Sequence, residues 1–340
     1  MIHPTFNPMI GPSPYVLINM GARFVPCMRL TKGTEGRDFP CPETTSSNPA
    51  DAVNHCTLPK LCGFGAPANG SQPSQWFRFI IPMFMHAGII HIGFNMLLQL
   101  TMGREMELEI GSLRFALVYF SSGIFGFVLG GNFAPPAIAS TGASGCLFGV
   151  LALVLLDLIY SWNERPKPGR ELLIILLDIV ISFVLGLLPG LDNFSHIGGF
   201  LMGLVLGICI LHSPNVLRQR TGMASTLYEP MASGRTSENG GVGTFVKGPV
   251  GFFKGRKAAW WAWWLLRTGA LIGVLVSFIV LLNNFYVYKT GCSWCKYLSC
   301  ININNWCELG NIEPLKSGSR RDLMTTSAQL GRNLFNRPRS

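Results

Sequence analysis

Residues 142–161 read GASGCLFGVLALVLLDLIYS, and Asp157 is the only charged residue among them. No Asp, Glu, Lys or Arg occurs between Arg114 and Asp157. A helix needs roughly 20 consecutive apolar residues to cross a hydrocarbon core about 30 Å thick. Residues 142–161 are therefore long and apolar enough to form a transmembrane helix, and they predict a membrane protein.

The composition of the whole chain agrees with this interpretation. Hydrophobic residues make up 49% of the 340 residues and charged residues only 13%, whereas a soluble domain carries about a quarter charged residues. The net charge of +10 lies in loops and tails beside apolar stretches, so membrane topology explains it better than a nucleic-acid partner does. We therefore expect the lipid bilayer, and no nucleic acid, as a partner.

Six apolar stretches predict an all-α polytopic membrane protein with six transmembrane helices. Lys and Arg gather after the first, third and fifth stretches, whereas the alternate short loops have none. Cytosolic loops collect Lys and Arg, so this pattern places both termini on the lumenal or extracellular side. The stretches are 79–101, 113–131, 142–161, 172–189, 194–212 and 260–284.

Eight of the ten cysteines lie on the predicted non-cytosolic side, four before the first stretch and four after the last. Two even sets in an oxidising compartment predict about two disulfides in each region, with the connectivity open. A zinc site at Cys292 and Cys295 is the alternative, and the intramembrane Cys146 and Cys209 are expected to be packing residues. The eight are Cys27, Cys41, Cys56, Cys62, Cys292, Cys295, Cys300 and Cys307.

The chain is expected to divide into five regions. Residues 76–212 hold five of the six stretches and form the core bundle. The other regions are a lumenal or extracellular N-terminal segment (1–75), a flexible cytosolic linker (213–259), a C-terminal transmembrane helix (260–284), and a lumenal tail with cysteines and a disordered end (285–340).

Polar groups inside transmembrane helices are costly and therefore mark candidate functional sites. Ser144 lies between Gly142 and Gly145 at the start of a predicted helix, where its backbone N–H is among the unpaired donors of the first turn. His196 begins another predicted helix on the same side, and Gly199 allows a neighbouring helix to approach it closely. A serine nucleophile and a histidine base at one depth predict acyl-transfer chemistry.

The first stretch adds His91 and Asn95, which are four residues apart and so project from one helical face. They predict two side-chain donors for a developing oxyanion, with helix–helix hydrogen bonding as the alternative. His86 is expected in the same helix as a packing or supporting residue. Asp192 precedes His196 by one turn and is a weaker candidate to orient it. Two further intramembrane carboxylates, Asp157 and Asp178, are expected near the cytosolic side, remote from this group.

Four motifs in order carry a family resemblance. They are WFRF (76–79), HAGIIHIGFN (86–95), GASG (142–145) and HIGGFLMG (196–203). Together they resemble the rhomboid family of intramembrane serine proteases, in particular the secretory-pathway type with an extra C-terminal span and its fungal members. The likeness covers about residues 1–290. It implies that residues 76–212 form a protease core in which Ser144 and His196 are a catalytic dyad.

The resemblance also implies supporting roles. His91 and Asn95 match the residues that line the family's oxyanion hole, and Phe148 matches an aromatic that stacks on the catalytic histidine. Trp76 and Arg78 match a loop motif that dips into the membrane, although an interfacial anchor is the alternative. No cofactor and no metal is implied.

The predicted function is an intramembrane endopeptidase that cleaves single-span membrane proteins within or beside their transmembrane segment. The Golgi, endosome and plasma membrane all suit the cysteines, and the oligomeric state is open. This type of rhomboid has a further span ahead of the Trp–Arg loop, and residues 1–75 offer none, so we expect a form that lacks its first span. A catalytically silent protein that binds membrane clients is the alternative function.

Overall fold

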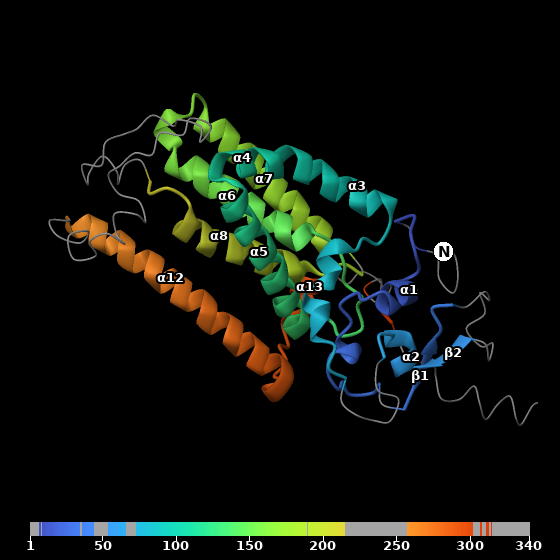
Figure 1. Cartoon of the computed structure of the whole chain (residues 1–340). Helices are drawn as coiled ribbons and strands as arrows, with labels where there is room; N and C mark the ends of the chain where they lie inside the picture. Colours follow the sequence, from blue (N-terminus) through green and yellow to red (C-terminus); the bar gives the residue numbers. More distant parts are fainter. Residues whose placement is uncertain are drawn as a thin grey trace, which may run out of the picture. The chain divides into compact units, whose positions relative to one another are not determined.

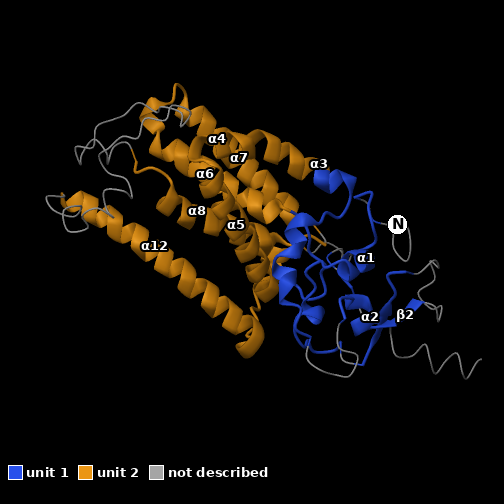
Figure 2. Ribbon diagram, viewed as in Figure 1, with its two compact units in different colours: residues 1–92, 135–142, 302–340 blue, residues 93–134, 143–301 orange. Residues whose placement is uncertain are grey.

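The computed structural model describes residues 7, 9–34, 36–43, 54–65, 73–188, 190–214, 257–301, 307, 311, 312 and 314. The chain separates into two compact units, drawn in different colours in Figure 2. The first comprises residues 1–92, 135–142 and 302–340, and the second comprises residues 93–134 and 143–301.

The first unit is built from short helices and strands (Figure 1) and contains two disulfides. Strands β1 and β2 pair antiparallel with Phe39 opposite Cys56. Disulfides join Cys27 to Cys62 and Cys41 to Cys56. Phe24, Phe39 and Leu61 are among the fully buried side chains of its small core. The elements are α1 (Pro14–Asn19), β1 (Asp38–Pro40), β2 (His55–Thr57) and α2 (Leu58–Cys62).

The disulfide prediction is confirmed for the N-terminal region, where two bridges form. In the C-terminal region Cys292 is joined to Cys295, and Cys300 and Cys307 are also disulfide-bonded. The alternative of a zinc site at Cys292 and Cys295 is therefore wrong, because a disulfide sulfur is not a thiolate ligand.

The second unit is a helical bundle in which α5, α6 and α8 pack against one another most extensively. Val118, Val150 and Leu153 are among its most buried core residues. The apolar sequence of these helices supplies the contacts that hold the bundle together. Its helices are α4 (Arg104–Ile110), α5 (Ser112–Phe133), α6 (Ser144–Tyr160), α7 (Pro168–Gly186), α8 (Asn193–Ile210), α12 (Ala258–Asn283) and α13 (Lys296–Ser299).

Glycines bring the backbones of α6 and α8 together. A Cβ placed on Gly199 would lie 2.0 Å from the carbonyl oxygen of Gly145, and one placed on Gly203 would lie 2.5 Å from that of Gly149. Only residues without a side chain allow this approach, which is the usual means of close packing between transmembrane helices. The expectation that Gly199 admits a neighbouring helix is confirmed.

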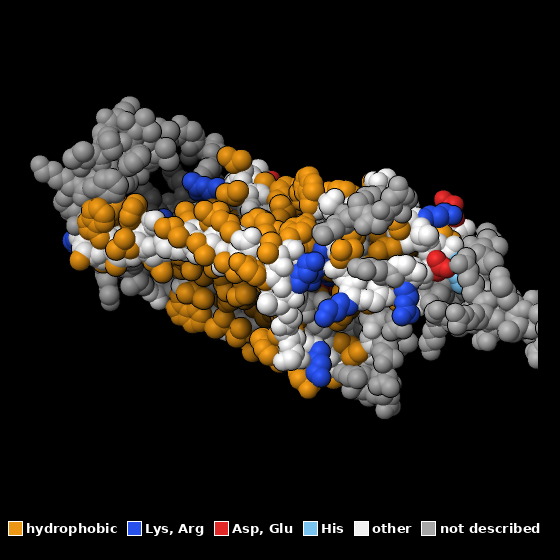
Figure 3. All heavy atoms as spheres, turned by 90° about the horizontal axis from the view of Figure 1, so that it is seen from below, with side chains coloured by type: hydrophobic (Ala, Val, Ile, Leu, Met, Phe, Trp, Pro, Cys, Tyr) orange, Lys and Arg blue, Asp and Glu red, His pale blue; other side chains and the backbone are white. Residues whose placement is uncertain are grey.

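Three helices within the described residues are long and apolar enough to cross a membrane: Ser112–Phe133, Asn193–Ile210 and Ala258–Tyr288. Helix α6 is apolar but shorter, and α7 carries charged residues near its start. The last of the three, which includes α12, has exposed apolar side chains along its length, and Figure 3 shows them gathered over this helix. A helix with an apolar surface of this kind needs lipid or another protein to cover it.

The first predicted span differs from the structure. Residues 76–84 form two short 3-10 helices, Trp76–Phe79 and Ile81–Phe84, and α3 begins only at Ile89 (Ile89–Leu98). A π-helix at Gln99–Gly103 then joins α3 to α4. The α-helix cannot extend back through Pro82 because proline lacks the N–H that continues a helix.

Tertiary packing sets the start of α3 as well. A Cβ on Gly88 would lie 2.1 Å from the carbonyl oxygen of Met9, so this segment is fixed against the N-terminal backbone. His86 therefore lies in the loop that precedes α3, and its expected place inside the helix is wrong.

Candidate active site

Ser144 is the first residue of α6, directly after the N-cap residue Ala143. Its backbone N–H is one of the four first-turn donors that have no carbonyl acceptor within the helix. The preceding Gly142 has a φ of 119°, a conformation that residues with side chains rarely adopt. The sequence around the serine thus forms a sharp turn into a helix.

His196 lies in the first turn of α8 and contacts Ser144. Its Nε2 is 2.9 Å from the serine Oγ. In a neutral imidazole the unprotonated nitrogen accepts the hydroxyl proton, so the serine Oγ–H donates to Nε2 when Nδ1 carries the ring hydrogen. The structure therefore brings Ser144 and His196, the predicted nucleophile and base, within hydrogen-bond distance.

An aromatic stack fixes the histidine ring. Phe148, one turn after Ser144, lies with its ring centroid 4.5 Å from that of His196, at an interplanar angle of 14°. Phe183 of α7 packs on the same phenylalanine at 4.8 Å. Stacking of this kind restricts rotation of the imidazole and keeps Nε2 directed at the serine.

Asp192 acts as the N-cap of α8. Its carboxylate accepts a hydrogen bond from the backbone N–H of Ser195 at 3.2 Å, and the hydroxyl of Ser195 donates to it as well. These bonds satisfy the first turn of the helix that carries His196. Asp192 therefore supports His196 through the helix start.

A small cavity of about 50 Å³ lies beside the serine. Most of its walls are apolar, and Asp178 and Ser182 of α7 contribute polar groups. The expectation that Asp178 lies remote from the site is wrong, because α7 packs along α6 and brings this carboxylate to the pocket that Ser144 lines. The other lining residues are Leu98, Met102, Leu147, Phe148, Val150 and Leu151.

His91 and Asn95 lie on successive turns of α3, as predicted. The backbone N–H of Ala87 donates to Nδ1 of His91 at 3.2 Å, so a neutral ring carries its hydrogen on Nε2 and can donate from there. Asn95 is the buried residue of α3. His91 belongs to the first unit and Asn95 to the second, and their role at an oxyanion stays a prediction.

Arg78 holds the first unit together. Its guanidinium is fully buried and donates to the carbonyl oxygens of Ile18 at 2.8 Å and Cys62 at 2.6 Å, and to Oε1 of Gln75 at 2.7 Å. Burial lowers its pKa to about 10. Because Arg78 is buried, it is not an interfacial anchor, whereas Trp76 is 62% exposed and suits that role.

Two residues of α7 support the histidine without any signal in the sequence: Gly186 lies beside the ring, and Phe183 packs on Phe148, which stacks on it. A Cβ on Gly186 would lie 2.9 Å from Nδ1 of His196, so this glycine makes room for the ring. A glycine and a phenylalanine in an apolar stretch carry no functional signal of their own, and only the packing of α7 on α8 and α6 shows their place.

The range matched to a known family contains all four motifs. Residues 73–213 match the model of the Rhomboid domain. The chain is 53% identical over 337 residues to Rhomboid-type serine protease 2 of Emericella nidulans, which covers 91% of this chain and 66% of that protein. It is 30% identical over 294 residues to RHOMBOID-like protein 4 of Arabidopsis thaliana, covering 86% of this chain and 65% of that protein.

A third relative bears on catalysis. The chain is 30% identical over 255 residues to Inactive rhomboid protein 1 of Homo sapiens, covering 75% of this chain and 25% of that protein. The chain thus spans just under two thirds of the length of the first two relatives and a quarter of the third. The matched domain, the order of the motifs and the apolar helices place this chain in the rhomboid family, as a multi-pass membrane protein.

Proposed function

We propose that the protein is an intramembrane serine endopeptidase that uses Ser144 as nucleophile and His196 as general base. The observation that carries this proposal is the 2.9 Å contact between Ser144 Oγ and His196 Nε2, on a ring stacked by Phe148. A nucleophile within hydrogen-bond reach of an oriented base is the arrangement that activates serine.

The dyad supports two proton transfers. His196 accepts the Ser144 proton while Oγ attacks the scissile carbonyl, and the imidazolium then gives this proton to the leaving amine. Water hydrolyses the acyl-enzyme in the second half, with His196 again as base. The apolar walls beside the dyad favour the neutral imidazole with which the reaction begins.

Charge on the tetrahedral intermediate needs donors that are already in place. The backbone N–H of Ser144 is unpaired within α6 and points out of its first turn. Nε2–H of His91 and the side-chain amide of Asn95 are the proposed second and third donors. Loss of one such donor in other enzymes costs about 10²–10³ in kcat.

The proposed substrates are single-span membrane proteins, cleaved within or beside the transmembrane segment. The pocket beside Ser144 is lined mainly by Leu, Met, Val and Phe side chains, which suit an apolar segment that enters from the bilayer. An extended peptide must replace helical hydrogen bonds in this site, so we expect substrates with segments that unwind easily. Residence in the secretory pathway, in the Golgi, endosome or plasma membrane, belongs to the same proposal.

The second candidate function is client binding without cleavage. The likeness to Inactive rhomboid protein 1 favours it, whereas the intact Ser144–His196 contact favours the peptidase. The two functions differ in one measurable property, which is the reactivity of the Ser144 hydroxyl.

A fluorophosphonate probe tests that reactivity in membranes, beside cleavage of a tagged single-span reporter. We expect labelling and cleavage in the wild type, and neither in Ser144→Ala. Ser182→Ala is the matched control because Ser182 lines the same pocket and has no proposed role as nucleophile. Wild-type protein that binds the reporter but is neither labelled nor able to cut it would establish the client-binding function instead.

A further inference from the structure

A second polar cluster lies within the second unit, at the opposite ends of α6 and α8 from Ser144 and His196. Glu109 of α4, Asp157 of α6 and His212, two residues after α8, each offer an oxygen or nitrogen atom within 4.8 Å of the others. We call these three residues the distal cluster. The proposed peptidase mechanism does not use it.

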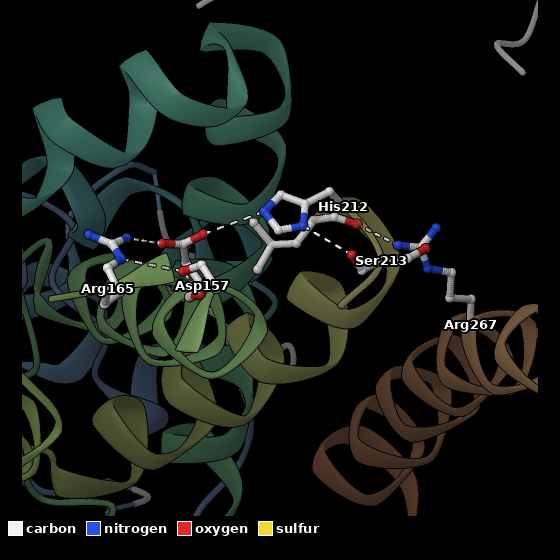
Figure 4. Close-up of polar contacts among 7 residues, drawn as sticks. Asp157, Arg165, His212, Ser213 and Arg267 are labelled. Atoms are coloured by element: carbon white, nitrogen blue, oxygen red, sulfur yellow. Dashed lines mark hydrogen bonds and ion pairs between the residues drawn. The ribbon is translucent and has the colours of Figure 1, made fainter. Parts of the chain in front are cut away.

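Asp157 is the buried centre of the distal cluster. Its side chain is 4% exposed, and Oδ2 accepts a hydrogen bond from Arg165 at 2.6 Å. Oδ1 is also buried, accepts no hydrogen bond and lies 3.7 Å from Nε2 of His212. Figure 4 shows the carboxylate between the guanidinium and the imidazole. Arg165 therefore satisfies one oxygen of Asp157, and the other is directed at His212.

A backbone contact fixes the tautomer of His212. Its Nδ1 lies 3.2 Å from the carbonyl oxygen of Ser213, and a carbonyl can only accept, so Nδ1 carries the hydrogen. In the neutral ring Nε2 then presents a lone pair to Oδ1 of Asp157. Two lone pairs that face each other require positive charge between them, either a proton or a metal ion. A backbone carbonyl on the second ring nitrogen is also the usual support of a metal-binding histidine.

Glu109 adds a second carboxylate to the same place. One of its carboxylate oxygens lies within 4.8 Å of the ligand atoms of Asp157 and His212. Two carboxylates that share a partly buried site repel each other, and this repulsion increases the demand for a cation. Arg165 compensates only part of this negative charge, because it binds Oδ2 of Asp157, whereas Oδ1 faces His212.

We propose that Glu109, Asp157 and His212 bind one divalent transition-metal ion of the zinc type. One imidazole nitrogen and two carboxylate oxygens are ligands that zinc accepts, with water completing the coordination. At metal–ligand distances of about 2.0–2.2 Å, neighbouring ligand atoms lie about 3.3 Å apart. The 3.7 Å between Asp157 Oδ1 and His212 Nε2 needs only a small closure to reach that value. The bound ion would join α4, α6 and the end of α8.

Zinc binding to the full-length chain in detergent micelles tests this site. Titration calorimetry and thermal unfolding are measured after chelator treatment, with zinc chloride as the probe. We expect stoichiometric binding and a raised Tm in the wild type, and affinity reduced by at least about tenfold in His212→Gln and Glu109→Gln. Both variants keep Asp157 and its ion pair with Arg165, and thermal unfolding without zinc checks that they fold.

Two matched controls separate this site from incidental zinc binding. Glu105→Gln changes an exposed carboxylate on the same helix as Glu109, and His86→Gln removes a histidine outside the distal cluster. Both should bind zinc as the wild type does. Wild-type protein that binds no zinc, or cluster variants that bind it within twofold of the wild type, would overturn the proposal. Neither result bears on cleavage by Ser144, so failure here is distinguishable from failure of the peptidase.

Discussion

The two ends of α6 and α8 carry two very different polar groups. At one end Ser144 and His196 share a single hydrogen bond against an aromatic stack and apolar walls. At the other end Asp157 lies between Arg165 and His212, and Glu109 adds a second carboxylate beside it. The first arrangement is the one on which the proposed proton transfer from Ser144 to His196 depends. The second suits the binding of a cation or the fixing of helix ends.

The difference shows why the same residue types take different roles. A histidine beside a hydroxyl in an apolar site works as a base, whereas a histidine beside a carboxylate works as an ion-pair partner or a ligand. Gly145, Gly149, Gly199 and Gly203 couple the two ends, because they hold α6 and α8 in direct backbone contact. Substitutions at either end, or between them, can therefore separate catalysis from stability.

The largest effect is expected at the dyad. Ser144→Ala and His196→Ala should each lower kcat for a membrane reporter by about 10⁵-fold, because nucleophile and base act as a unit. The double variant should lose no more activity than either single variant. The unfolding free energy of each variant should stay within about 0.5 kcal/mol of the wild-type value. Additive losses in the double variant would mean that the two residues do not act together.

Between the two ends, Gly199→Val should be the most destabilising substitution. Its side chain would meet the carbonyl of Gly145, where even a Cβ lies only 2.0 Å away. We expect a loss of about 3 kcal/mol in unfolding free energy, with loss of cleavage as the helices separate. Gly273→Ala in α12, where nothing lies within 4 Å of the added Cβ, is the control and should unfold like the wild type. Equal stability of both variants would show that the helix contact is looser than described.

At the distal end, Arg165→Gln should destabilise the protein by about 2 kcal/mol. It leaves the buried Asp157 carboxylate without its charged partner, and the exposure of Arg165, at 40%, keeps the cost below that of a fully buried pair. Arg170→Gln should have little effect on unfolding measured by denaturant. A wild-type unfolding free energy in Arg165→Gln would indicate that Asp157 is already neutral or has another cation.

The smallest effect is expected from the aromatic stack. Phe148→Leu removes the ring on His196 and should cost about 1 kcal/mol of transition-state stabilisation, roughly fivefold in kcat/KM. Phe148→Tyr keeps the ring and should retain most of the activity. If the Phe148→Leu and Phe148→Tyr variants cleave the reporter equally well, the aromatic ring does not orient His196 and contributes only packing.

Local motifs predicted that Ser144 and His196 lie together, because small residues around Ser144 and the glycines after His196 are visible in the sequence. They predicted the first span poorly, although Pro82 and Gly88 were signals that the helix could not run through residues 79–88. Asp178 was misplaced because a count along the sequence gives the depth of a residue in a bilayer and not the cavity that its helix face lines. Glu109, Asp157 and His212 lie on separate elements, and no spacing rule joins them.

The sequence by itself determined the class of this protein. Long apolar stretches require a membrane, even sets of cysteines indicated disulfides, and four ordered motifs indicate the rhomboid family, because each of these signals is local. Only the tertiary structure decided which cysteines pair, where α3 begins, that Nε2 of His196 reaches Ser144, and that a second polar cluster forms at the other end of the same helices. These features depend on how α6, α7 and α8 pack, and packing joins residues that local sequence patterns do not connect.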